Sequence, residues 1–332
     1  MARQGIGILS TGSYVPKEEI DNEEVAARVG VETEWIARKT EILTRRYAAP
    51  SEATSDLAAR AAHNALEQAG LDPGRIDYII LSTSTGDSPQ PPTSYLVQDR
   101  IAAWNAACFD INVVCSGFVY GLELARTLVA QRPGSRVLVI AADLYSRCLD
   151  FSDRRTAVLL GDGAGAAVVG AVPEAAGFVG FRLASRGDAQ RLIRVEAGGS
   201  RLPASEATVA EGAHFFRMDG RGVRDFVLEE FPPLVAELAE DCGVGVDEIR
   251  HFVPHQPNGV LLRQLAEKCG LGAARTHRTL DRYGNTGSAS AAVTLDEAHR
   301  AGELRPGDLV LIGTFGGGMS MGAGLMHWPE AS

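Results

Sequence analysis

Residues 110–118 read Asp-Ile-Asn-Val-Val-Cys-Ser-Gly-Phe. A short apolar strand runs into Cys115, and the stretch from Phe118 to Val129 has the apolar spacing of an amphipathic helix. The pattern predicts a strand-to-helix turn at Cys115, where unpaired backbone N–H groups and the helix dipole favour a thiolate. A thiolate is the nucleophilic form of cysteine. Cys115 is therefore a candidate nucleophile, although cysteine is also among the residue types most often simply buried.

The composition limits the function classes. The chain has 332 residues, of which 45% are hydrophobic and 22% charged, with a formal net charge of −10. These values are typical of a globular protein of one large or two ordinary domains, and the negative charge argues against nonspecific nucleic-acid binding. Neither a signal peptide nor an apolar run of membrane-spanning length is recognisable. Five cysteines, an odd number without Cys-x-x-Cys spacing, suit reduced thiols in a cytoplasm and predict no metal site.

The first elements alternate between strand and helix. The sequence predicts a strand at 5–14, a helix at 18–38, a helix at 55–69 and a strand at 76–81. Such alternation, with short runs of Val, Ile and Leu, predicts an α/β fold in which helices cover buried sheets.

Two parts of the chain resemble each other. Gly243 lies 173 positions after Gly70, and the same offset relates four further pairs: Ile76 and Ile249, Pro133-Gly134 and Pro306-Gly307, Asn112 and Asn285, and Leu122 and Leu295. Such agreement indicates an internal duplication into two βαβ-containing halves, 1–172 and 173–332. We expect the halves to stack as five layers, α/β/α/β/α, with a site between them.

The second half supplies polar partners for Cys115. Phe252-Val-Pro-His-Gln-Pro-Asn258 ends a strand with His255, and Asp281 to Ser290 forms a glycine-flanked turn around Asn285. A lone histidine or a lone asparagine in a turn is more often structural. Their joint position at sheet edges opposite the cysteine half favours a site made of Cys115, His255 and Asn285.

Several motifs carry a family resemblance. They are Cys115-Ser-Gly-Phe118, Pro254-His-Gln-x-Asn258, Tyr283-Gly-Asn-Thr-Gly-Ser-Ala-Ser290 and the tail from Thr314 to Ala323, with Glu34 to Ile36, Asp153 to Thr156 and Gly161 to Ala166 in addition. Together they resemble β-ketoacyl-acyl carrier protein synthase III of the thiolase superfamily. The resemblance covers nearly the whole chain and implies a thiolase-like fold.

The resemblance implies a decarboxylative condensation. Cys115 would accept an acyl group from an acyl-coenzyme A, and a malonyl thioester would then lose carbon dioxide and attack the acyl-cysteine. His255 and Asn285 would donate hydrogen bonds to the enolate oxygen, and the backbone N–H groups of Cys115 and Gly317 would form the oxyanion hole.

The resemblance also assigns binding residues. Trp35 and Arg154 would hold the adenine of coenzyme A. Lys39, Arg155 and Asn258 are further candidates for the coenzyme side.

The acyl and malonyl pocket is expected at Phe315, Asn112 and Gln90. In dimeric relatives, a residue near Gln90 reaches into the neighbour's pocket, so the resemblance implies a homodimer. A polar wall at Gln90 leads to the hypothesis that the starter is larger or more polar than acetyl.

Glycine-rich segments have other interpretations. Gly161 to Ala166 resembles a dinucleotide fingerprint, but it leads into an expected strand at 167–170 where the fingerprint needs a helix, so we interpret it as close packing and expect no cofactor. Gly316 to Gly318 follows a buried strand and is the expected oxyanion loop.

One departure leaves the second substrate open. Relatives commonly carry an arginine shortly after His-Gln-x-Asn for docking an acidic acyl carrier protein, whereas this chain has Gly259-Val260. Arg221 and Arg224 could substitute. Both an acyl carrier protein and coenzyme A therefore remain candidate carriers of the malonyl group.

Three alternatives to the condensing enzyme stay open. The same acyl-cysteine could pass its acyl group to an alcohol or amine. A hydroxymethylglutaryl-CoA-synthase-like or thiolase-like enzyme is a second alternative, although a thiolase would have another cysteine near the C-terminus. A catalytically silent subunit is a third, but such subunits usually lose the nucleophile.

Overall fold

The structure, a computed structural model that describes residues 4–330, contains two five-stranded sheets. The first has the order β1-β7-β6-β4-β5, and the second β8-β14-β13-β11-β12. The strands of the first sheet are β1 (Gln4–Tyr14), β7 (Asp162–Pro173), β6 (Val137–Leu144), β4 (Tyr78–Ser82) and β5 (Ala107–Ile111). Those of the second are β8 (Gly177–Ser185), β14 (Ser320–His327), β13 (Leu309–Gly316), β11 (His251–Pro254) and β12 (Arg275–Thr276).

The two sheets are built alike. In each, the first three strands of the order pair antiparallel, and the last three pair parallel. The predicted duplication is therefore confirmed, since equal order and equal strand directions in both sheets describe one unit used twice. β7 ends at Pro173 and β8 begins at Gly177, so we propose that the halves divide between these strands.

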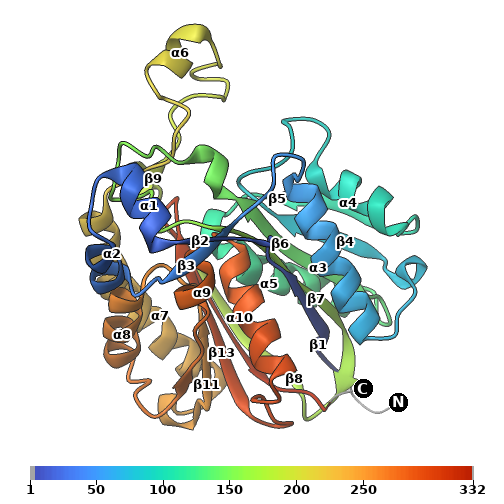
Figure 1. The fold of residues 1–332 in the computed structure, drawn as a ribbon. Coiled ribbons are helices and arrows are strands. Elements are labelled where there is room, and N and C mark those ends of the chain that lie inside the picture. The colour runs from blue at the N-terminus through green and yellow to red at the C-terminus, as the bar shows by residue number, and fades with distance from the viewer. Residues whose placement is uncertain (1–3, 331–332) are drawn as a thin grey trace.

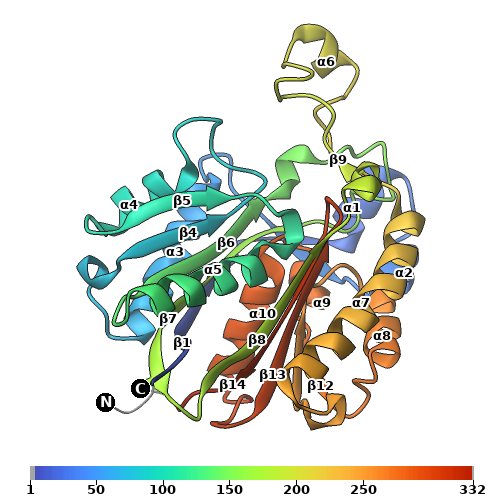
Figure 2. The same ribbon diagram turned by 180° about the vertical axis from the view of Figure 1, so that it is seen from behind.

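Helices cover both sheets and separate them. α5 (Gly117–Gln131) and α10 (Ala289–Arg300) pack between the sheets, where their apolar residues share one core with both (Figure 1). α3 (Thr54–Gln68) and α4 (Thr93–Ile101) cover the outer face of the first sheet. α7 (Gly220–Cys242) and α8 (Gly259–Lys268) cover the outer face of the second (Figure 2). The expected five layers are confirmed, and Cys115 is placed at the start of a central helix.

The helix expected at 18–38 is wrong as a single element. The segment forms β2 (Glu18–Asp21), α1 (Asn22–Val29) and α2 (Thr33–Thr40), and β2 pairs with β3 (Thr44–Tyr47). Asp21 caps α1 by accepting a hydrogen bond from the Glu24 N–H, and Gly30 ends it with a φ of 69°. An N-cap and a left-handed glycine are ordinary helix boundaries, and here they override the helical pattern.

The remaining small elements complete the chain. They are β9 (Ile193–Arg194), α6 (Glu206–Ala210), β10 (Arg217–Met218) and α9 (Leu280–Tyr283). α6 stands away from the body at the end of a long excursion between β9 and β10 (Figures 1 and 2). Among the described residues, no helix has the length and apolar character to cross a membrane.

The glycine-rich segment that resembles a dinucleotide fingerprint lies in β7. A Cβ atom at Gly165 would come within 2.5 Å of the Ala292 Cβ, so α10 approaches the first sheet only because no side chain intervenes. The interpretation as close packing is confirmed.

We predict that the two pseudo-equivalent leucines of the central layer support the fold equally. Leu122 on α5 and Leu295 on α10 are both fully buried in the shared core. Leu122→Ala and Leu295→Ala should each lower the free energy of unfolding by about 3 kcal/mol, since each leaves a cavity. Chemical denaturation measures this, with exposed Leu124→Ala on α5 as the control. A loss below about 1 kcal/mol in either core variant would contradict the shared core.

Candidate active site

Cys115 lies on a tight turn between β5 and α5. Val114 has a φ of 48°, an uncommon conformation for a β-branched residue, and residues 114–116 form one 3₁₀ turn before α5 begins at Gly117. A side chain at Gly117 would overlap the Ser82 hydroxyl, so the turn needs glycine there. The predicted strand-to-helix turn is confirmed. It holds Cys115 at the buried N-terminal end of a central helix.

The glycine loop of the second half packs against this turn. A Cβ atom at Gly316 would lie 2.7 Å from the Cys115 Cβ. The Ser320 hydroxyl lies 3.2 Å from the Val113 carbonyl and 3.0 Å from that of Gly317, and the Ser116 hydroxyl donates to the Ser320 carbonyl. These bonds keep the expected oxyanion loop, including Gly317, beside the cysteine.

Burial changes the acid–base behaviour of the cysteine. Cys115 is 8% exposed. Desolvation raises the pKa of its thiol well above the ordinary value, and the charge of Asp143 raises it further, while a backbone hydrogen bond opposes both only in part. The expectation that the turn alone favours a thiolate is therefore wrong for this resting site. The free enzyme holds a thiol that must lose its proton when it attacks.

His255 follows β11 and faces the site as a neutral ring. Its Nδ1 lies 2.7 Å from the Ser290 hydroxyl, and its ring meets that of Phe315 edge-on at 5.3 Å between centres. Burial lowers the pKa of His255 to about 3, so the imidazole is uncharged at neutral pH. Nε2 has no hydrogen-bonding partner in the part of the chain that the structure describes, which leaves it for a substrate.

Asn285 lies on a turn that is hydrogen-bonded to the first half through its backbone. Its N–H donates to the Leu159 carbonyl, and its own carbonyl accepts from the Gly161 N–H. The side-chain oxygen accepts a hydrogen bond of 3.0 Å from the Gly287 N–H. Because this oxygen is engaged, the amide NH₂ group is the part of the side chain free to donate.

A cavity of about 350 Å³ leads to Asn285. Its walls contain Trp35, Lys39, Arg155, Asn258 and Asn285, which brings together four residues expected on the coenzyme side and one expected catalytic residue. Arg154 lies outside the wall, with its guanidinium carbon 5.6 Å from the centre of the Trp35 ring, within cation–π range.

Three residues that the sequence assigned to the substrate pocket have other contacts or positions in the structure. Asn258 caps α8 by accepting a hydrogen bond from the Leu261 N–H, so part of its side chain is already engaged. Asn112 is exposed, and its oxygen accepts from the Val114 N–H at 3.4 Å, which supports the turn. Gln90 is exposed, in the loop before α4, and is not among the residues that line the cavity. Phe315, in contrast, is buried beside His255 as expected.

Comparisons with known proteins cover almost the full chain. A 3-oxoacyl-[acyl-carrier-protein] synthase III family model matches residues 109–187, and the model of its C-terminal part matches residues 239–328. The chain is 48% identical to acetoacetyl CoA synthase NphT7 of Streptomyces sp. (strain CL190) over 97% of this chain and 98% of that protein. It is 41% identical to a β-ketoacyl-[acyl-carrier-protein] synthase III of Caldanaerobacter subterraneus subsp. tengcongensis over 98% of each. The chain belongs to the β-ketoacyl-acyl carrier protein synthase III family.

Solved structures agree with this assignment. The synthase III of Pseudomonas aeruginosa superimposes with a TM-score of 0.90 at 33% identity, covering 98% of this chain and 99% of that one. The priming β-ketosynthase of the R1128 polyketide pathway gives a TM-score of 0.90 at 32% identity over 100% and 98%. The fold is thus thiolase-like, and the protein is a condensing acyltransferase of the synthase III type.

Sequence reasoning missed three residues that shape this synthase site. Ser290 contacts His255, Ser320 joins the Cys115 turn to the glycine loop, and Asp143 lies buried between the halves. Ser290 and Ser320 lie within the motifs that carry the family resemblance, so those motifs could have indicated both residues. Asp143 lies in an otherwise apolar strand, and its charge in that strand was the only sequence feature that could have indicated a role.

We predict an alkaline pH profile for alkylation of Cys115. A free cysteine has a pKa of about 8.5, and burial raises the pKa of the Cys115 thiol. The fraction of reactive thiolate at Cys115 should therefore still increase with pH at values where a free cysteine is already ionised. Iodoacetamide labelling, followed by mass spectrometry of the Cys115 peptide, should give a rate still rising at about pH 9. A rate that levels off below about pH 7 would show that the helix N-terminus outweighs burial.

Proposed function

We propose that this protein transfers an acyl group from acyl-coenzyme A to Cys115 and condenses it with a malonyl thioester to give a β-ketoacyl thioester. Three observations support the proposal: the Cys115 turn packs against Gly316, neutral His255 contacts the neighbouring Phe315, and Asn285 lines the cavity. The free cysteines support action in a reducing cytoplasm.

In the first step, the Cys115 sulfur attacks the thioester carbonyl. The carbon–sulfur bond to coenzyme A breaks, and the proton of the Cys115 thiol leaves with coenzyme A as its free thiol. Burial disfavours a charged His255 ring, so the ring stays neutral through this step and the proton passes to the leaving sulfur. The backbone N–H groups of Cys115 and Gly317 are the proposed donors to the transient oxyanion.

In the second step, the malonyl thioester loses carbon dioxide and becomes an enolate. The His255 Nε2 and the Asn285 NH₂ group are the proposed donors to its oxygen, and neither has a hydrogen-bonding partner among residues 4–330. The enolate carbon attacks the acyl carbonyl, the bond to Cys115 breaks, and the released sulfur takes up a proton. An amide donor does not ionise, which suits an enolate better than a carboxylate would.

Trp35 and Arg154 are the proposed clamp on the adenine of coenzyme A. The indole is half-buried at the mouth of the cavity, with the guanidinium over it. Arg155 and Lys39 on the same wall are exposed and have the positive charge that phosphates require.

The carrier of the malonyl group is proposed to be coenzyme A, with acyl carrier protein as the second candidate. Arg263 and Arg278 both pair with Glu41, and Arg224, which lines the cavity, contacts Asp225. This pairing reduces the positive charge available to an acidic carrier protein. The 48% identical relative is named for a coenzyme A product, which supports the same choice.

The starter range is proposed to include acetyl. The Gln90 hypothesis favours a larger or more polar group, whereas acetoacetyl, in the name of the 48% identical relative, contains an acetyl unit. Because Gln90 lies outside its own site, any influence on chain length would come through a second subunit.

A homodimer is proposed through the free edge of the first sheet. β5 ends that sheet, and its unpaired edge can pair with another strand. Trp104, which precedes β5, is 65% exposed, an unusual position for so large an apolar side chain. β5 is followed in the chain by the turn that carries Cys115, so pairing of β5 in a dimer would also hold that turn in place.

We predict that acyl loading and condensation can be observed separately. Intact-protein mass spectrometry after incubation with acetyl-, branched and longer acyl-coenzyme A should show one acyl adduct, absent in Cys115→Ala and kept in Cys108→Ala. Malonyl-coenzyme A should discharge it into a β-ketoacyl product faster than malonyl-acyl carrier protein does. An adduct that neither donor discharges would favour transfer to an alcohol or amine, and no adduct would refute the proposal.

We also predict that the protein is a dimer that Trp104→Glu weakens, because the new charge would be buried at the interface. Sedimentation velocity should give a dimer for the wild type and a shift towards monomer for the variant, with Leu124→Glu on an exposed face of α5 as the control. A monomeric wild type would contradict the proposal.

A further inference from the structure

Asp143, near the end of β6, is a fully buried carboxylate without an ion-pair partner in the described chain. Every group around its oxygens is an N–H or a hydroxyl. Burial raises the pKa of Asp143, while hydrogen bonds from Ser84, Ser288 and Thr85 oppose that shift. So many donors at one buried acid are typical of a carboxylate that holds structure in place.

The two oxygens of Asp143 serve different halves. Oδ1 accepts from the Ser84 N–H at 2.9 Å and from the Thr85 hydroxyl at 3.0 Å, both in the first half. Oδ2 accepts from the N–H of Ser288 at 2.8 Å and from its hydroxyl at 2.7 Å, in the second half. One side chain therefore joins the segment after β4 to the turn that carries Asn285.

This turn has little freedom once Ser288 is held. Gly287 has a φ of 60°, and a Cβ atom there would lie 2.5 Å from the Asp143 Oδ2, so the turn lies directly on the carboxylate. The Gly287 N–H donates to the Asn285 side-chain oxygen, which aims the amide. A displacement of Ser288 would move the adjacent Gly287, and the bond from the Gly287 N–H would then change the direction of the Asn285 amide.

We propose that Asp143 is a positioning residue that holds the Asn285 turn against the half that carries Cys115, so that condensation depends on Asp143 more than acyl loading does. The inference rests on the proposed function and adds to it. Acyl loading uses the Cys115 turn and the glycine loop, which Ser320 and Ser116 secure independently of Asp143. Condensation needs Asn285, which the carboxylate holds.

Asp143→Asn is the direct test. An asparagine in this place has one oxygen, so its NH₂ group would face either the N–H of Ser288 or that of Ser84, and the N–H that it faces would lose its acceptor. We expect the single-turnover rate of acyl discharge by malonyl-coenzyme A to fall roughly tenfold or more, as for small misplacements of a catalytic group. The rate of acyl loading on Cys115 should not fall, because its oxyanion donors are untouched and because loss of the Asp143 charge lowers the pKa of the thiol.

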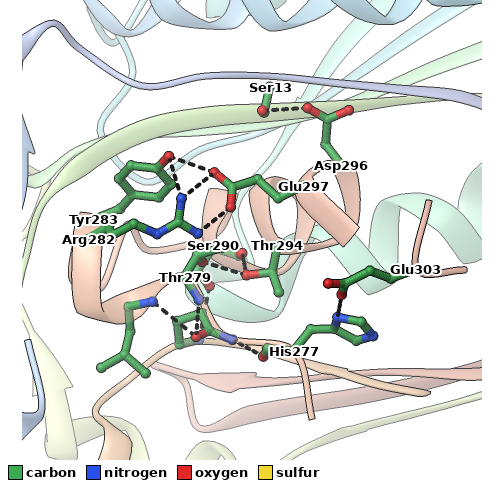
Figure 3. A network of polar contacts seen from close by, with 12 residues as sticks. Ser13, His277, Thr279, Arg282, Tyr283, Ser290, Thr294, Asp296, Glu297 and Glu303 are labelled. Carbon is green, nitrogen blue, oxygen red and sulfur yellow. Dashed lines mark hydrogen bonds and ion pairs between the residues drawn. The ribbon is translucent and has the colours of Figure 1, made fainter. Parts of the chain in front are cut away.

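A matched control is available in Asp296 on α10. This aspartate is also fully buried and also joins the halves, because it accepts a hydrogen bond from Thr11 and another from Ser13, both on β1. Figure 3 shows the bond from Ser13. Asp296 makes no contact with the Asn285 turn through these bonds. Asp296→Asn should lower stability without changing the ratio of the two rates.

Ser288→Ala keeps the inference testable if Asp143→Asn does not fold. It removes the hydroxyl bond to Oδ2 and leaves the N–H bond, so discharge should fall by a smaller factor and loading should not. Equal losses in both steps, or unchanged discharge, would overturn the inference. A wild-type protein that loads no acyl group, or loads it and is never discharged, would instead refute the proposed function.

Discussion

The structure depends on a backbone constraint at Val114 and Cys115. The chain leaves β5 at Ile111, turns through the left-handed residue Val114 and enters the central helix α5 at Gly117, where a side chain would overlap Ser82. The turn is held from the other half, because Gly316 touches Cys115 and Ser320 bonds across to Val113. Neither half can therefore form the site alone. The candidate nucleophile Cys115 belongs to the first half, and the expected oxyanion loop belongs to the second.

The duplication explains why such a site is possible. Both sheets have the same strand order, and both send a helix into the central layer, α5 and α10, which begin after Cys115 and after Asn285. The pseudo-equivalent helix starts thus bring a nucleophile and an amide donor into the same region. Burial then sets their chemistry: it keeps Cys115 a thiol and His255 an uncharged ring. Low dielectric strengthens the hydrogen bonds on which both proposed steps depend.

The sequence was sufficient for the fold and, through its motifs, for the family. The single offset that links Gly70 with Gly243 predicted the paired sheets, and the Cys115, His255 and Asn285 motifs predicted where the halves meet. The sequence-based predictions were wrong where tertiary contacts determine the helix boundaries or the ionisation of a side chain. The break at Gly30 replaced one long helix by a strand and two helices, and desolvation reversed the expected ionisation of Cys115. Asp143 stayed hidden because its partners, Ser84 and Ser288, lie far apart in the chain.

The most direct test of a site shared between the halves is a crystal structure of Cys115→Ala with acyl-coenzyme A bound. The account predicts adenine between Trp35 and Arg154, the pantetheine arm in the cavity that ends at Asn285, and the thioester carbon within reach of the replaced sulfur, with its oxygen directed at the N–H groups of residues 115 and 317. A coenzyme that entered by another face, or a thioester lying away from the turn, would contradict it.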